Sequence, residues 1–314
     1  MRFAFIFPGQ GSQSVGMGRS IAQAFSVARE AFEEVDDSLH QKLSSLMWEG
    51  PESELTLTEN AQPAIMAVSL GVLRVLEREA GLDISRHARL LAGHSLGEYS
   101  ALAAAGCLRL GDAAKLLKLR GRAMQEAVPA GEGAMSALIG IEVEDAEAAA
   151  VEAAAQGGIC VVANDNAPGQ VVISGTKETV ERAGVFAKEK GARRVMSLAV
   201  SAPFHCPLMA PAAEKMREAL AQVALRPPAA PILANVTATE VAEPEAIRSL
   251  LVEQVTARVR WRESVLSFRS LGADATVECG GGKVLTGMVK RIDRDLETIS
   301  IDTPADIEAF ARRL

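Results

Sequence analysis

The stretch AGHSLGEYSAL, residues 92–102, holds a serine between two glycines in the order Gly93-His94-Ser95-Leu96-Gly97. This G-x-S-x-G spacing is that of a nucleophile elbow, a tight strand-to-helix turn that exposes a serine hydroxyl. The apolar run ARLLAG before it predicts a buried strand, and the alanine-rich stretch 98–108 after it predicts a helix. Because the motif needs this strand–turn–helix context, Ser95 is the candidate nucleophile.

The segments around the motif alternate between strand and helix patterns. Residues 2–7 (RFAFIF) predict a second buried strand, which ends in the glycine-rich turn PGQGSQ. Helical periodicity follows in residues 21–35 and 61–81, and near 208–224, 244–271 and 283–292 with one more helix at the end. Further strands are predicted at PILANV, ATVEC and ETISI. This alternation predicts an α/β fold with a parallel sheet.

The stretch 128–197 has a different order of elements. Its patterns give strand, helix, strand, strand, helix and strand, which is the ferredoxin-like β-α-β-β-α-β arrangement. Because α/β segments lie on both sides, we expect an inserted small subdomain at 128–197. The large catalytic domain then comprises residues 1–127 and 198–314.

Composition excludes several classes of protein. The 314 residues carry a formal net charge of −7, and a nucleic-acid binder usually shows a basic surplus. No window approaches 18 uncharged apolar residues, and the first residues do not match a signal peptide, so we expect a cytoplasmic protein away from the membrane. The four cysteines are scattered without a C-x-x-C pair, so neither a metal site nor a disulfide framework is predicted.

A serine nucleophile needs a base within hydrogen-bond reach, and the chain has four histidines. His94 adjoins Ser95, and its side chain is expected to point away on an elbow. His40 and His87 lie in polar or charged stretches typical of surfaces. His205, where the inserted segment returns to the large domain, is therefore the candidate base. No histidine follows it, and no obvious acid lies between Ser95 and His205, so a Ser–His dyad is favoured over a triad.

The oxyanion donors expected from the turn geometry are the backbone N–H of Leu96 and one N–H of the PGQGSQ turn. Glycines at positions 9 and 11 allow the backbone there to approach a substrate closely. The alternative is that PGQGSQ is an ordinary strand-to-helix turn.

Seven motifs are spread along the chain: FPGQGSQ (7–13), GHSLGEYSAL (93–102), LRGRAMQEA (119–127), ANDNAPGQVVISG (163–175), SAPFHCPLM (201–209), RVRW (258–261) and KVLTGMVKRI (283–292). They occur in the order seen in malonyl-CoA:acyl carrier protein transacylases, and the chain resembles that family over essentially its whole length. The resemblance implies a hydrolase-like large domain with a nucleophile elbow and a ferredoxin-like insertion. It also implies malonyl transfer from malonyl-CoA to holo acyl carrier protein, with no bound cofactor or metal.

The family's functional residues can be carried over position by position. The resemblance implies a nucleophile, a base, two oxyanion donors, a carboxylate-binding arginine and three supporting residues; these are Ser95, His205, Gln10, Leu96, Arg120, Gln254, Asn164 and Phe204. The backbone carbonyl of Gln254 is the expected acceptor for the other ring N–H of the histidine. Phe204 departs from many bacterial relatives, which carry serine there, and it would narrow the space beside the α-carbon of the acyl group, which favours malonyl. Without the resemblance, Arg120 reads as part of the solvated face of a basic helix.

The partners follow from the same resemblance. We expect a monomer that meets an acidic acyl carrier protein through a local basic patch, either the run 115–122 or the cluster Lys283, Lys290, Arg291 and Arg294. The alternatives are a thioesterase, an acyltransferase of a polyketide synthase or malonate decarboxylase system, and a non-catalytic carrier-binding protein. A hydrolase fits less well because the late histidine is missing and the arginine motif is present.

Overall fold

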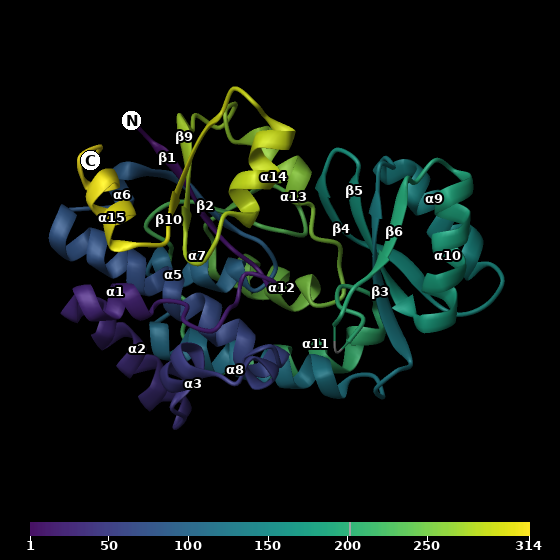
Figure 1. Cartoon of the computed structure of the whole chain (residues 1–314), viewed down its shortest axis with the longest axis horizontal. Helices are drawn as coiled ribbons and strands as arrows, with labels where there is room; N and C mark the ends of the chain where they lie inside the picture. The colour runs from purple at the N-terminus through teal and green to yellow at the C-terminus, as the bar shows by residue number, and fades with distance from the viewer. Residues whose placement is uncertain (201) are drawn as a thin grey trace.

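The computed structural model describes residues 1–200 and 202–314, which form two sheets with helices packed on them. Ser201, the first residue of SAPFHCPLM, lies outside the described residues. Figure 1 shows the two sheets side by side along the long axis of the molecule, with the chain's middle third forming the smaller one. In the described part of the chain, no helix is long and apolar enough to cross a membrane.

The larger sheet has six strands in the order β10-β9-β1-β2-β7-β8. Their bounds are β1 Phe3–Phe7, β2 Ala88–Gly93, β7 Ile232–Leu233, β8 Glu240–Val241, β9 Ala275–Cys279 and β10 Glu297–Ile301. Neighbouring strands are parallel except for β7 and β8, so the sheet is mixed. The α/β prediction is confirmed.

The central strand β1 explains why residues 2–7 read as a continuous apolar run. Phe3, Phe5 and Phe7 point into one hydrophobic core, and Ala4 and Ile6 into another on the opposite face. Both faces of a parallel sheet are covered by helices, so an inner strand such as β1 is apolar on both faces.

The helices of the large unit cover both faces of this sheet. They are α1 Arg19–Ala24, α2 Ser26–Leu39, α3 Leu43–Glu49, α4 Glu52–Leu55, α5 Thr58–Ala80, α6 Ile84–His87, α7 Gly97–Ala104, α8 Leu110–Glu126, the short 3₁₀ helix η1 Pro207–Met209, α11 Ala210–Ala221, α12 Pro244–Gln254, α13 Trp261–Ser267, α14 Val284–Ile292 and α15 Pro304–Ala311. Helix α5 is buried along most of its length and packs against α2, α7 and α8. It forms the centre of the larger core.

The smaller sheet is antiparallel, in the order β4-β5-β3-β6, and has a core of its own. Its elements are β3 Gly133–Ile139, α9 Val143–Ala154, β4 Cys160–Ala167, β5 Gln170–Thr176, α10 Lys177–Glu189 and β6 Arg194–Ser197. The two helices pack on one face, at the far end of the molecule in Figure 1. The element order is the one predicted from the sequence.

Three segments differ from their sequence patterns. The helix predicted at 21–35 is broken at Phe25, which is extended and separates α1 from α2. The helix predicted at 98–108 ends at Ala104, because Gly106 adopts a left-handed φ of 71°. PILANV contributes only two residues to a strand, since its asparagine turns toward the end of β2 instead.

Candidate active site

Ser95 lies between β2 and α7 in a left-handed backbone conformation, with φ of 53°. A non-glycine residue held there stores strain that the surroundings must offset. Asn235, just after β7, supplies two of the restraints: its Oδ1 accepts the Ser95 N–H at 2.7 Å and its Nδ2 donates to the Gly93 carbonyl at 2.6 Å. The hydroxyl is thereby fixed at the carboxyl end of the sheet.

Glycines on both sides of Ser95 are required by close backbone approach. A Cβ on Gly93 would lie 1.9 Å from the carbonyl carbon and oxygen of Gly97, and a Cβ on Gly97 would lie 2.2 Å from the Phe7 oxygen. The turn therefore packs backbone against backbone, which only glycine permits. This is the physical reason for the spacing seen in the sequence.

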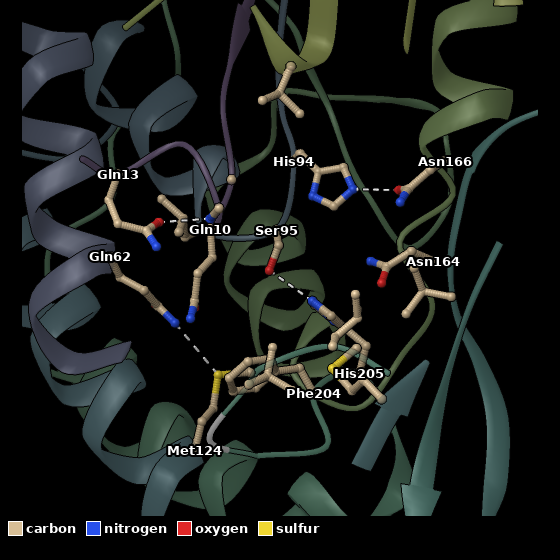
Figure 2. A pocket seen from close by; sticks show the side chains of 18 of the residues that line it. Gln10, Gln13, Gln62, His94, Ser95, Met124, Asn164, Asn166, Phe204 and His205 are labelled. Atoms are coloured by element: carbon tan, nitrogen blue, oxygen red, sulfur yellow. Dashed lines mark hydrogen bonds between the residues drawn. The ribbon is translucent and has the colours of Figure 1, made fainter. Parts of the chain in front are cut away.

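His205 is the histidine that reaches the serine. Its Nε2 lies 2.8 Å from Ser95 Oγ, as Figure 2 shows, and its Nδ1 lies 2.9 Å from the Gln254 carbonyl and 3.1 Å from the Ala257 carbonyl. Carbonyls only accept hydrogen bonds, so Nδ1 carries the proton and Nε2 is free to accept the serine hydroxyl. The orienting groups are backbone carbonyls rather than a carboxylate.

The small sheet fixes the loop that carries these carbonyls. Val259 N donates to the Ala163 carbonyl at 2.8 Å, and Asp165 N donates to the Val259 carbonyl at 3.0 Å. The loop after α12 is thus tied to β4. His205 is held from both units of the molecule.

The electrostatic surroundings keep His205 neutral. Burial, together with the positive charge of Arg120, lowers its pKa to about 3. The imidazole is therefore in its neutral form at neutral pH, and this form can accept the serine proton. A negative charge brought next to Arg120 would offset part of this effect.

Arg120 is buried on the inward face of α8, with 1% of its surface exposed, so it does not belong to a solvated basic face. Its guanidinium donates to Ser95 Oγ at 3.1 Å, to Gln254 Oε1 at 2.8 Å and to Gln62 Oε1 at 2.9 Å, and it lies over the ring of Tyr99. Its Nε has no partner in the described part of the chain. A buried, incompletely paired guanidinium is suited to binding a carboxylate.

The Gln254 side chain joins Arg120 to a buried carboxylate. Gln254 Nε2 donates to Glu98 Oε2 at 2.7 Å and to the Ser95 carbonyl at 3.1 Å. Asn235 N donates to the same Glu98 oxygen at 3.1 Å. Burial raises the pKa of Glu98 to about 7. One network therefore contains the nucleophile, the arginine and a carboxylate.

Gln10 and Leu96, whose backbone N–H groups are the candidate oxyanion donors, both line the pocket. Within residues 1–200 and 202–314, neither N–H has a hydrogen-bond partner. Leu96 also lies at the N-terminal end of α7, where the helix dipole favours negative charge. These two N–H groups are suited to binding an oxyanion.

These groups line a pocket of about 320 Å³ between the two sheets. Phe204 and Asn164 are buried in its wall, and Figure 2 shows both beside the histidine. The remaining wall is mostly apolar and comes from both units, with α14 contributing from the large one. It includes Met124, Met135, Val172, Leu198, Val200, Val284, Leu285 and Met288. A polar end and apolar sides suit a small polar group on a long flexible arm.

The other histidines do not contact Ser95 Oγ in the described structure. His94 turns toward Asn166, with its Nε2 2.8 Å from Asn166 Oδ1 (Figure 2). His40 is exposed, and the Nδ1 of His87 accepts the Asp83 N–H. Among the described histidines, His205 is thus the one whose ring lies within hydrogen-bond distance of Ser95 Oγ.

The basic run at 115–122 is not one surface patch, which corrects an expectation from the sequence. Arg120 points inward, while Lys118 and Arg122 both pair with Glu59 at 3.3 and 3.1 Å. In the second cluster, Lys283, Lys290, Arg291 and Arg294 are all exposed. Burial and ion pairing thus weaken the case for the run 115–122, and the second cluster remains the candidate basic patch for binding the carrier protein.

Sequence reasoning missed three residues of the site: Gln62, Glu98 and Asn235. Two of them carried a signal, because Gln62 and Glu98 are polar side chains at the start of otherwise apolar helical stretches. Buried polar groups of this kind are usually hydrogen-bonded, and at a pocket they suggest function. Asn235 gave no such signal.

Comparison with known proteins gives a consistent result. A family model described as an acyl transferase domain matches residues 4–301. A malonyl CoA-acyl carrier protein transacylase of Bacillus subtilis is 45% identical, covering 100% of this chain and 97% of that protein. An acyl-carrier-protein-S-malonyltransferase of Bartonella henselae has a solved structure that is 51% identical, with a TM-score of 0.97 and coverage of 100% and 99%.

A further solved structure contains a partner. It is a malonyl-transacylase in complex with a holo type II polyketide synthase acyl-carrier protein. Its chain is 43% identical, with a TM-score of 0.96 and complete coverage of both chains.

Proposed function

The chain belongs to the acyl transferase family, and we propose that it moves a malonyl group from malonyl-CoA to the phosphopantetheine thiol of acyl carrier protein. The acyl group is carried between the two thiols as an ester on Ser95. Fatty acid synthesis is the pathway that the names of the similar proteins favour.

The observation that carries this proposal is the distance of 3.1 Å from the buried guanidinium of Arg120 to Ser95 Oγ. An ester formed at Oγ would place the free carboxylate of a malonyl group beside that guanidinium. Planar, bidentate pairing with arginine is available to malonyl but not to acetyl or butyryl.

The first half-reaction forms the ester. His205 Nε2 takes the hydroxyl proton as Ser95 Oγ bonds to the thioester carbon, and the oxyanion is stabilised by the N–H groups of Gln10 and Leu96. The C–S bond then breaks, and CoA leaves as a thiol with the proton from His205. The bound carboxylate offsets the charge of Arg120, so we infer that His205 is a stronger base in this complex than in the empty site.

The second half-reaction reverses these steps with a different thiol. His205 takes the proton of the phosphopantetheine thiol as its sulfur bonds to the ester carbon, and the same oxyanion forms. The C–O bond to Ser95 then breaks, and the hydroxyl recovers its proton from His205. This order is a ping-pong mechanism.

We further propose that the strand–turn–helix at Ser95 is a hydrolase-type nucleophile elbow and that the small antiparallel sheet is a ferredoxin-like subdomain. The proposed boundaries are 128–197 for the subdomain and 1–127 with 198–314 for the catalytic domain. Supporting evidence is the strained Ser95, the two separate cores and the strand order of the small sheet.

Two pocket residues are assigned supporting roles. Phe204 is buried in the pocket wall, where it would restrict substituents on the α-carbon of the acyl group. Asn164 lines the same end of the pocket on β4, beside the strand residues that hold the histidine loop. We assign the first to acyl selection and the second to shaping the site.

Intact-protein mass after brief mixing with malonyl-CoA or acetyl-CoA tests the function. A malonyl adduct that needs Ser95 and is discharged by holo acyl carrier protein is the expected result. Free malonate without carrier-dependent discharge would instead make the protein a thioesterase. The rate at which malonyl-Ser95 is discharged is then compared between a carrier protein of fatty acid synthesis and one of a polyketide synthase. The faster carrier indicates which pathway the enzyme serves.

A further inference from the structure

Glu98 is a fully buried carboxylate on α7 to which the proposed reaction assigns no step. Neither Glu98 nor Arg120 forms a direct ion pair with any residue that the structure describes. Burying two opposite charges without joining them is costly, so the arrangement requires an explanation.

The Gln254 amide lies between the two charges. Its Oε1 accepts from Arg120 Nη2 at 2.8 Å, and its Nε2 donates to Glu98 Oε2 at 2.7 Å. Each end of the amide faces the charge that it can bind, so its orientation is fixed from both sides. The amide is a spacer that lets the charges stabilise each other while part of the guanidinium stays open toward Ser95.

We propose that Glu98 is a remote counter-ion of Arg120, held off by Gln254, and that it takes up one proton from solvent when the substrate's carboxylate binds Arg120. Glu98 is in this sense a positioning residue, since it acts through Gln254 and Arg120. The inference rests on the proposed function, because it needs a carboxylate at that guanidinium.

The number of charges in the buried network explains why Glu98 takes up a proton. The empty site holds one guanidinium and one carboxylate, whereas the malonyl complex adds a second carboxylate to the same buried network. Two carboxylates sharing a single cation disfavour each other's ionisation, and the buried Glu98 is the easier of the two to neutralise. Both hydrogen bonds to Glu98 end on Oε2, so a proton on Oε1 breaks neither.

The other ionisable groups near this network do not compete for that proton. Burial raises the pKa of Tyr99, on the same helix, so it stays neutral. Burial and Arg120 lower the pKa of His205, on the loop before η1. Gln254 of α12 and Asn235 after β7 contribute neutral groups. The raised pKa of Glu98 lies where a second negative charge would protonate it at neutral pH.

The test compares wild type with Glu98→Gln in the full-length enzyme. The donor is the malonyl thioester of N-acetylcysteamine, which has no phosphate that titrates near neutral pH. The half-saturating concentration for acylation of Ser95 is measured by mass between pH 6 and pH 8.5. In wild type it should rise with pH above about 7, by up to tenfold for each unit by which malonyl raises the Glu98 pKa.

Glu98→Gln should remove this rise and bind malonyl more tightly than wild type at pH 8. Glu126→Gln, an exposed carboxylate at the end of α8, is the matched control and should keep the wild-type profile. The acetyl thioester should show no such pH dependence with either enzyme. A Glu98→Gln profile that keeps the wild-type slope, or that is weaker by the same factor at every pH, would overturn the inference.

A second measurement does not depend on the variant folding. Wild type mixed with the malonyl thioester in dilute buffer at pH 7.5 should take up a substantial fraction of one proton per acylated serine, followed with an indicator dye. The released thiol remains protonated at that pH. Acylation without proton uptake overturns the inference, whereas absence of any malonyl-Ser95 instead overturns the proposed function.

Discussion

At the scale of single residues, Arg120 is the group through which this site distinguishes acyl chains. It lies on a helix with three other basic residues, yet it alone is buried beside Ser95. An acyl group without a carboxylate leaves it paired only with neutral amides and the hydroxyl. Removing one partner of a buried ion pair costs about 3–5 kcal/mol, or roughly two to three and a half decades of discrimination, and the remote Glu98 offsets only part of this loss.

Arg120→Ala should therefore lose roughly a hundredfold or more in malonyl transfer and gain tolerance for acetyl-CoA. The measurement is the acylation rate of Ser95 with each donor. Arg122→Ala, two residues along and exposed on the same helix, should change neither rate by more than about twofold. Equal losses with both donors in Arg120→Ala would contradict the carboxylate role.

His205 makes a prediction about pH. An unshifted histidine, with pKa near 6.5, is about three-quarters protonated at pH 6 and so is largely lost as a base. Because the His205 pKa is lowered mainly by burial, which persists when malonyl offsets the charge of Arg120, the base stays available below that point. At saturating malonyl-CoA, acylation at pH 6 should keep more than half of its pH 8 rate. A decline centred near pH 6.5 would show that the imidazole is not shifted.

At the scale of elements, the turn between β2 and α7 depends on backbone packing. Gly93→Ala would force a Cβ to within 1.9 Å of the Gly97 backbone, and backbone cannot give way as the end of a flexible side chain would. We expect a loss of about 4 kcal/mol in the free energy of unfolding, or no folded protein. Denaturant unfolding followed by circular dichroism measures it.

The matched control is Gly287→Ala in α14, where an added Cβ meets no atom within 4 Å. Replacing a helical glycine by alanine should stabilise the protein by about 0.5–1 kcal/mol. Near-equal effects of the two substitutions would refute the packing argument.

At the scale of the whole molecule, α14 connects the pocket to the surface. Leu285 and Met288 line the pocket, while Lys290 and Arg294 are exposed just beyond. Arg291 reaches the small unit, with bonds to Gln170 at 2.7 Å and to the Pro168 carbonyl at 3.2 Å. We propose this face as the docking surface for an acidic carrier, whose arm would then enter between the two units.

Reversing two charges, Lys290→Glu with Arg294→Glu, should raise the carrier KM about tenfold at low salt and leave the malonyl-CoA half-saturation unchanged. The difference in carrier KM between the variant and wild type should shrink near 0.5 M salt, where exposed charges are screened. Lys115→Glu, an exposed lysine of α8, is the control. A larger effect from Lys115, or a KM that ignores ionic strength, would rule out this surface.

Local patterns in the sequence determined much of this protein. The α/β alternation, the order of the small unit and the strand–turn–helix at Ser95 depend on neighbouring residues, so periodicity and glycine spacing predict them. Elimination among four histidines pointed to His205, and resemblance supplied Arg120 and Gln254. The ends of helices were less predictable, because they depend on the backbone conformation of one residue. Phe25 is extended and separates α1 from α2, and Gly106 is left-handed and follows the end of α7.

Only the tertiary structure decided how distant residues meet. Arg120 reads as one basic residue among several until the folding of α8 against α5 and α7 buries it. Glu98 and Asn235 are 137 positions apart and meet because β2 and β7 are neighbours in the sheet. Burial and long-range contacts set the charges of Glu98 and His205, and a linear pattern carries neither quantity.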